Sequence, residues 1–327
     1  MALPVSELHT FLIYAVFGYA LVYPLALLCL KLFSIDHPGQ RRHLYLLALL
    51  APAAGFLLYH TVLTKRCQAE LIHPETGGGL LQLICLVSDR ALQYAAPILA
   101  FVFGLGLLKA GAAVLLVRRL RMKAVQPSAG LAWRVETILK RRCHTAAAIT
   151  APEVIYSSRT GFAAFTAGLI KPVLVLNYAL AAELTEQELD AVLAHELVHI
   201  SRKDTVKNWL LSLLRDLTFF NPISTILMRR IMLENERICD REAVVLTGHN
   251  NATYAAVLLR VWRLILEQRP FQSGPVSAFT GGGNELEDRL TALLRSRNGE
   301  KPLPSWIFRP LTAVFIAVTI LFLGLIC

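Results

Sequence analysis

The sequence predicts a mainly α-helical membrane protein in which four transmembrane helices hold one α+β domain, inserted between the third and the fourth helix. Of its 327 residues, 55% are hydrophobic and 17% are charged, and the mean hydropathy is +0.52. This composition is more apolar than that of an ordinary soluble domain. The apolar residues gather in four long runs, and the last two runs are separated by residues 118–308, a stretch of domain size.

The four runs lie at about 8–32, 44–63, 91–117 and 309–327, and each is long enough to cross the hydrocarbon of a bilayer. The first run lacks the basic start of a cleaved secretory signal, because Glu7 precedes it. We therefore expect a membrane region over 1–117 with three retained helices, and a fourth helix at 309–327.

Basic residues predict the orientation of these helices. Residues 1–30 contain no lysine or arginine, whereas basic residues follow the first and third runs and precede the fourth: Lys31, Arg41, Arg42, Arg118, Arg119, Arg121, Lys123 and Arg309. The positive-inside rule then places the N-terminus outside a bacterial-type cytoplasmic membrane and residues 118–308 in the cytoplasm. The net charge of +10 is explained largely by these flanking positions, so the expected partner is the lipid bilayer and no direct nucleic-acid partner is needed.

Within the inserted domain, short β-like runs separated by glycine and proline predict strands near 153–156, 163–166 and 173–176. A helix over 131–142 precedes them. A second helix, over roughly 186–203, follows them, because Thr185 and Glu188 form a capping box and apolar residues then recur at helical spacing.

The helix over 186–203 carries His195-Glu-Leu-Val-His199. Residues four apart lie above one another on a helix, so both imidazoles point at one place while Glu196 lies beside them. A catalytic zinc needs a third protein ligand and leaves its fourth position for water. We expect one Zn²⁺ ion bound by His195, His199 and Glu236, with Glu196 as general base. Asp240, one turn beyond Glu236, would accept the outer N–H of a ligand histidine.

Several residues near these motifs have alternative interpretations. An isolated His-Glu-x-x-His motif can be an ordinary charged helix face. Glu234 is an alternative third ligand, although on a helix it would face away from Asp240. Asp204 either contacts the second histidine or is a solvated helix end. We expect Cys239 to be a small buried apolar side chain and Tyr254 to be structural, although a fourth ligand and an oxyanion partner are the respective alternatives.

These motifs resemble those of the BlaR/MecR-type integral membrane zinc metallopeptidases, which are gluzincins. The resemblance rests on the run from His195 to Asp204, on Phe219-Phe-Asn-Pro222 and on Glu236-Arg-Ile-Cys-Asp240. The segment preceding the zinc helix and the four-span layout are also similar, so the resemblance covers essentially the whole chain. It implies a cytoplasmic zinc peptidase domain that is activated from outside, cleaves itself and promotes removal of a transcriptional repressor.

The sequence departs from these receptors at its C-terminal end. In the receptors a penicillin-binding sensor domain follows the fourth span, whereas this sequence ends at Cys327 and contains no Ser-x-x-Lys acylation motif. We therefore do not expect this sequence to bind a β-lactam directly, and a separate sensor protein is one candidate partner. The stretch 271–285 resembles, by its position, the region of self-cleavage, with Ser277, Ala278 and Phe279 as the candidate site, and an ordinary loop is the alternative.

The predicted function is that of a zinc-dependent metalloendopeptidase that cleaves itself or a cytoplasmic regulator as part of signalling. The alternatives are a membrane quality-control or CaaX-type peptidase and a non-proteolytic membrane scaffold. In a peptidase, the segment 162–168 could act as an edge strand for an extended substrate, or it could only cover the core. The sequence leaves open the oligomeric state and whether Cys67 and Cys85 form a disulfide.

Overall fold

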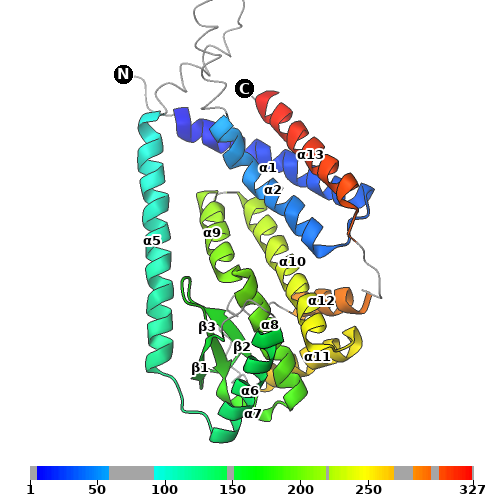
Figure 1. Ribbon diagram of the computed structural model, residues 1–327. Helices are drawn as coiled ribbons and strands as arrows, with labels where there is room; N and C mark the ends of the chain where they lie inside the picture. Colours follow the sequence, from blue (N-terminus) through cyan, green and yellow to red (C-terminus); the bar gives the residue numbers. More distant parts are fainter. Residues whose placement is uncertain are drawn as a thin grey trace, which may run out of the picture. The chain divides into compact units, whose positions relative to one another are not determined.

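The computed structural model describes residues 6–58, 92–145, 151–218, 221–268, 283–295 and 302–325. It confirms a mainly helical protein with one small sheet (Figure 1). The chain divides into two compact units. Unit 1 comprises residues 1–106, 211–234 and 301–327, and unit 2 comprises residues 107–210 and 235–300. Each unit has its own core.

Unit 1 is built from α1 (Ser6–Leu32), α2 (Pro38–Leu58) and α13 (Ser305–Leu325), together with the beginning of α10 (Pro222–Thr247) and the end of α9 (Asp204–Leu217). Its core is apolar, with a few polar contacts inside it. The buried Tyr19 hydroxyl donates to the Leu49 carbonyl oxygen at 3.1 Å, and the Asn221 amide donates to the Ala15 carbonyl oxygen at 3.0 Å. These bonds join residues that are far apart in the sequence, so unit 1 is a packed bundle.

Apolar length distinguishes α1 from the other helices. Among the described residues, Ala15–Leu32 is the one segment long and apolar enough to cross a membrane, with a mean hydropathy of 1.9, and Ser305–Leu321 is a shorter apolar helix. Helices also cover most of the second and third expected spans, in α2 and in α5 (Leu92–Met122). Four membrane crossings and their orientation stay predictions.

Unit 2 contains a three-stranded sheet in the order β1-β3-β2. Its strands are β1 (Glu153–Ser157), β2 (Ala164–Ala167) and β3 (Val173–Asn177), so the three strand predictions are confirmed. β1 runs parallel to β3, and β2 runs antiparallel to it. Gly168 follows β2 with φ +93°, and a Cβ there would lie 2.5 Å from the Lys171 carbonyl oxygen. Only glycine fits this turn, which holds β2 at one edge of the sheet.

Helices pack on both faces of this sheet. On one side, β3 residues Leu174 and Leu176 share a buried core with Leu193 and Leu197 of α8 (Glu186–Arg202). On the other side, the alternate residues of β3 pack with the end of α5. Unit 2 also contains α6 (Ala129–Thr145), α7 (Tyr178–Glu183), α11 (Asn251–Glu267) and α12 (Gly283–Arg295). α8 is therefore fixed between the sheet and further helices, and its histidines have a rigid base.

α12 corrects one prediction. The stretch 271–285 was expected to be a loop as far as Glu285, but the helix already begins at Gly283. Glu285 lies in its first turn, where a carboxylate is favourable, and Leu286 and Leu290 follow at helical spacing. The candidate cleavage residues Ser277, Ala278 and Phe279 lie outside the described residues, as do Cys67 and Cys85.

Candidate metal centre

The position of the two histidines on α8 is fixed by both ends of that helix. At its start the Thr185 hydroxyl accepts from the Glu188 backbone N–H at 3.3 Å, while the Glu188 carboxylate accepts from the Thr185 N–H at 2.9 Å. This is the predicted capping box. At the other end Lys203 has φ +55°, which stops α8 and lets α9 begin at Asp204.

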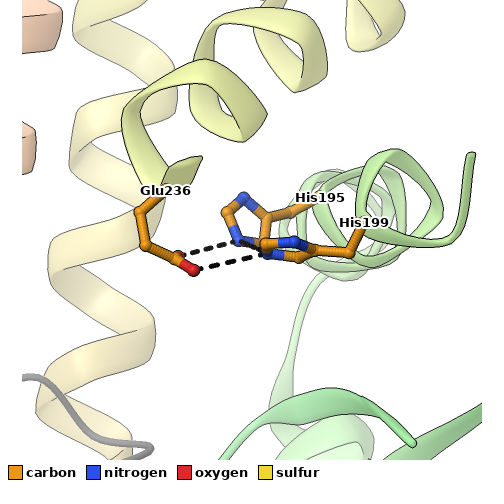
Figure 2. Close-up of side chains that lie close together, drawn as sticks. All are labelled: His195, His199 and Glu236. Carbon is orange, nitrogen blue, oxygen red and sulfur yellow. Dashed lines mark hydrogen bonds and ion pairs between the residues drawn. The ribbon is translucent and has the colours of Figure 1, made fainter. Parts of the chain in front are cut away.

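The side chains of His195, His199 and Glu236 converge on one point (Figure 2). The two Nε2 atoms are 3.1 Å apart, Nε2 of His195 is 3.3 Å from Oε2 of Glu236, and Nε2 of His199 is 3.5 Å from Oε1. Two ligand atoms about 2.1 Å from a tetrahedral zinc are about 3.4 Å apart. Two imidazole nitrogens and a carboxylate at these separations fit a zinc ion, and three such ligands leave the fourth tetrahedral position for water.

The outer nitrogen of each histidine faces an aspartate. Nδ1 of His195 is 3.2 Å from Oδ1 of Asp240, and Nδ1 of His199 is 3.0 Å from Oδ2 of Asp204. Both aspartates are buried. With its proton on Nδ1, each ring presents the Nε2 lone pair to the point of convergence. Of the two interpretations of Asp204, the structure thus shows contact with the second histidine.

Arg289 of α12 was not anticipated from the sequence. Its guanidinium donates two hydrogen bonds to the Asp240 carboxylate, of 2.8 Å from Nε to Oδ2 and of 2.7 Å from Nη2 to Oδ1. Its Nη1 also lies 3.2 Å from Oε2 of Glu236. Forty-nine positions separate Arg289 from Asp240, and no local pattern in the sequence connects them.

Tyr254 also approaches the centre, but from the outer side of a histidine ring. Its fully buried hydroxyl is 3.4 Å from Nδ1 of His195 and 3.5 Å from Oδ1 of Asp240. An oxyanion partner would have to lie on the Nε2 side of the ring, where a substrate carbonyl would be. The position of Tyr254 therefore agrees with a structural role.

Glu196 lies against the sheet. Its carboxylate accepts a hydrogen bond from the Thr166 hydroxyl on β2, with 3.0 Å between Oγ1 and Oε2. The side chain is mostly buried. α8 runs in contact with β2, so the same packing that orients the helix brings the edge strand to Glu196.

Two residues near the ligands have other partners. Glu234, the alternative ligand, forms an ion pair with Arg41 within unit 1, at 2.8 Å between Oε1 and Nε. Cys239 is fully buried, and its Sγ lies 3.4 Å from Nδ1 of His199 and 3.5 Å from Asp204. Burial and the nearby carboxylates raise the pKa of the Cys239 thiol far above its ordinary value. A metal binds the thiolate, so this neutral thiol fits the expected role of packing.

The ligand cluster forms a network of opposite charges. Burial alone would lower the pKa of His195, but its hydrogen bonds to Asp240 and Glu236 raise that pKa to about 10. Burial alone would raise the pKa values of Glu236 and Asp240, yet Arg289 and the neighbouring imidazole groups hold both below their usual range. At neutral pH the metal-free cluster therefore contains a protonated His195 between two carboxylates, and a metal must displace that proton.

The chain is similar to several known proteins. The family model described as "BlaR1 peptidase M56" matches residues 87–293, more than half of the chain. The methicillin resistance mecR1 protein of Staphylococcus aureus is 23% identical over 138 residues, which cover 41% of this chain and 23% of that protein. The regulatory protein BlaR1 of Bacillus licheniformis is 28% identical over 130 residues, which cover 39% of this chain and 21% of that protein. Protease HtpX of Hydrogenovibrio crunogenus is 28% identical over 182 residues, which cover 52% of this chain and 58% of that protein. Each match spans less than two thirds of the relative.

Proposed function

Because the chain belongs to the BlaR1 peptidase M56 family, we propose that it is a membrane-embedded, zinc-dependent metalloendopeptidase. The observation that carries this proposal is the convergence of His195, His199 and Glu236, whose ligand atoms all lie within 4.8 Å of one another. A zinc ion bound there supplies Lewis acidity for the scissile carbonyl and lowers the pKa of water towards ~7.

Glu196 is the general base of the proposed mechanism. It follows His195 directly on α8, and its carboxylate is held by the Thr166 hydroxyl at 3.0 Å. It accepts a proton from the attacking water and later delivers a proton to the leaving amine. The hydrogen bond from Thr166 restricts the carboxylate to one orientation, so the base does not have to be ordered during the reaction.

β2 is the proposed binding edge for an extended substrate. The Asn177 N–H donates to the Ala163 carbonyl oxygen at 2.8 Å, so these opposed residues form a hydrogen-bonded pair. Pairs alternate along an antiparallel ladder, so Phe165 also bonds to β3, whereas the backbone groups of Ala164 and Thr166 point away from β3. A substrate strand that pairs with this edge lies beside the residue that holds Glu196.

We further propose that the substrate is a protein that takes part in signalling. The support is the similarity to a regulatory protein and to a methicillin resistance protein. The candidates are the chain itself, cut near Ser277, Ala278 or Phe279, and a cytoplasmic regulator such as a transcriptional repressor. Activation by a separate sensor protein is compatible with this proposal, and so is assembly of the chain into an oligomer.

The proposal is tested with the full chain in bacterial membranes, in wild-type form and as Glu196→Gln. New protein N-termini are compared between the two by mass spectrometry, and bound zinc is measured on the purified proteins. We expect zinc in both proteins and new N-termini only with the wild type. Identical N-termini in the two samples would contradict peptidase activity, and a wild type without zinc would contradict the metal assignment.

The similarity to Protease HtpX favours a general membrane peptidase as the second candidate. The same experiment separates the two functions. A signalling protease yields one or a few cut sites that depend on Glu196 and on a stimulus, whereas a general peptidase cuts many unrelated membrane proteins. A non-proteolytic scaffold yields none, and it has no use for Glu196 because a structural zinc site needs no base.

A further inference from the structure

Arg289 is the one side chain of α12 that connects this helix to the metal ligands among the described residues. Three of its nitrogens are engaged: Nε and Nη2 with the two oxygens of Asp240, and Nη1 with Oε2 of Glu236. Asp240 in turn holds Nδ1 of His195. One guanidinium thus contacts one proposed ligand directly and reaches a second through one intermediate.

The geometry of these contacts limits how the ligands can rotate. A planar guanidinium that makes a two-bond fork fixes both the position and the plane of the Asp240 carboxylate. The fixed carboxylate then fixes the His195 ring, and the contact at Oε2 turns the Glu236 carboxylate so that Oε1 faces His199. An ammonium group provides a point charge without the fork, so lysine could not set both carboxylates in this way.

We propose that Arg289 is a positioning residue for the metal centre, so that the set of His195, His199 and Glu236 is fully aligned only while α12 is docked on the rest of unit 2. This inference rests on the proposed zinc site. The docking of α12 has its own support, because Leu293 is buried and the Asn251 amide donates to the Leu293 carbonyl oxygen at 3.1 Å. Occupancy of the centre and docking of α12 are then linked, and each favours the other.

If Arg289 acted only through its positive charge, it would change zinc affinity in the direction opposite to that expected for a positioning residue. A cation next to the ligands repels a divalent metal, so if Arg289 acted only through its charge, its removal would tighten zinc binding. If it aligns the ligands, its removal weakens zinc binding, as is usual when a group that orients a metal ligand is lost. The direction of the change therefore separates the two roles.

The test measures zinc affinity by competition with a chromophoric chelator, on the full chain purified in detergent. Arg289→Gln is expected to weaken zinc binding about 10- to 100-fold. Arg289→Lys is expected to weaken it nearly as much. Arg295→Gln, on the exposed part of the same helix, is the control and should leave the affinity unchanged. Wild-type affinity in Arg289→Gln or Arg289→Lys, or tighter binding in either, would overturn the proposal.

Two further measurements distinguish a loss of stability, an absence of linkage between zinc and α12, and a wrongly assigned metal site. Thermal unfolding in chelator shows whether a variant is merely less stable, since a structural role alone lowers Tm without changing zinc affinity. Hydrogen exchange on the wild type needs no variant: zinc should slow amide exchange in α12, and equal exchange with and without zinc contradicts the linkage. If the wild type binds no zinc, or Glu236→Gln binds it normally, the proposed metal site itself is wrong.

Discussion

Arg41 forms an ion pair with Glu234, with 2.8 Å between Nε and Oε1, and Glu234 stands two residues before Glu236 on the continuous helix α10. Residues two apart on a helix point to different sides. Glu234 therefore has its partner in unit 1, while Glu236 belongs to the histidine cluster of unit 2. Two carboxylates of similar appearance in the sequence thus receive different roles.

The first prediction separates these two glutamates. Glu236→Gln removes a charged metal ligand and should abolish stoichiometric zinc binding, whereas Glu234→Gln should bind one zinc ion as the wild type does. Glu234→Gln should instead lower the free energy of unfolding by about 1–3 kcal/mol, because a buried partner of Arg41 loses its charge. Metal analysis and thermal unfolding check both statements. Loss of zinc in Glu234→Gln would mean that the ligands are assigned wrongly.

The second prediction concerns the aspartate behind His199. Asp204→Asn should weaken zinc binding about 10- to 100-fold, because the amide presents either a donor or a weaker acceptor to Nδ1. Asp190→Asn is the matched control on α8, since the Asp190 carboxylate binds Arg142 and lies away from the metal ligands. The control should lose stability and keep its zinc affinity. Equal zinc affinity in the two variants would show that Asp204 does not support zinc binding.

The third prediction addresses the hydrogen bond between Thr166 and Glu196. Thr166→Val preserves the shape of the side chain and removes the hydroxyl, so kcat should fall roughly tenfold at unchanged zinc content. Thr166→Ser keeps the hydroxyl and should retain most of the activity. Steady-state cleavage of a protein substrate provides kcat. A Thr166→Val variant with full activity would show that Glu196 needs no such support.

The fourth prediction tests β2 as the substrate-binding edge. Ala164→Pro removes an N–H that points away from β3, so the fold should survive while kcat/KM falls about three- to tenfold through the lost bond to substrate. Phe165→Pro removes an N–H that bonds to β3 and should destabilise the sheet itself. Circular dichroism and peptide cleavage distinguish the two variants. Unchanged kcat/KM in a folded Ala164→Pro protein speaks against pairing at this edge.

The fifth prediction concerns pH. In the metal-free protein the raised pKa of His195 contributes stability that is complete below about pH 6.5 and is lost as pH rises towards about 10. The lowered pKa values of Glu236 and Asp240 contribute stability that is present above about pH 4.5 and is lost in acid. Zinc needs the neutral ring, so the rise in Tm caused by zinc should grow between pH 6.5 and 10.

This pH dependence is measured as the difference in Tm between wild type and His195→Gln, with chelator and with zinc. The difference cancels the titration of groups elsewhere in the chain. In chelator it should shrink as pH rises from 6.5 to 10. A difference that stays constant or grows over this range in chelator would mean that His195 is already neutral in the metal-free protein.

Local patterns carried most of what the sequence predicted correctly. The capping box of Thr185 and Glu188 placed the start of α8, and the spacing of His195, His199, Glu236 and Asp240 along two helices brought their side chains to common faces. Such spacing depends only on helix geometry. The three strands were equally local, because turn residues separate short β-branched and aromatic runs.

Contacts between residues that meet only through tertiary packing could not be predicted from the sequence. Arg289 comes 53 residues after Glu236, Thr166 comes 30 residues before Glu196, and Arg41 comes 193 residues before Glu234. Nothing in the neighbourhood of any of these residues indicates which distant carboxylate it will meet. The start of α12 was missed for a related reason, because the glycines at 281–283 suggested a loop and the leucines that fix the helix follow them.

The aspartates behind the two histidines have a consequence for how the site exchanges its ion. A half-turn of either ring would put carbon where Nε2 now stands, and the contacts of Asp240 and Asp204 oppose that turn. While these contacts hold, the rings have little rotational entropy left to lose when an ion binds. A divalent ion that binds there would meet imidazole nitrogens that are already oriented, so supply and ligand preference would decide which ion is bound.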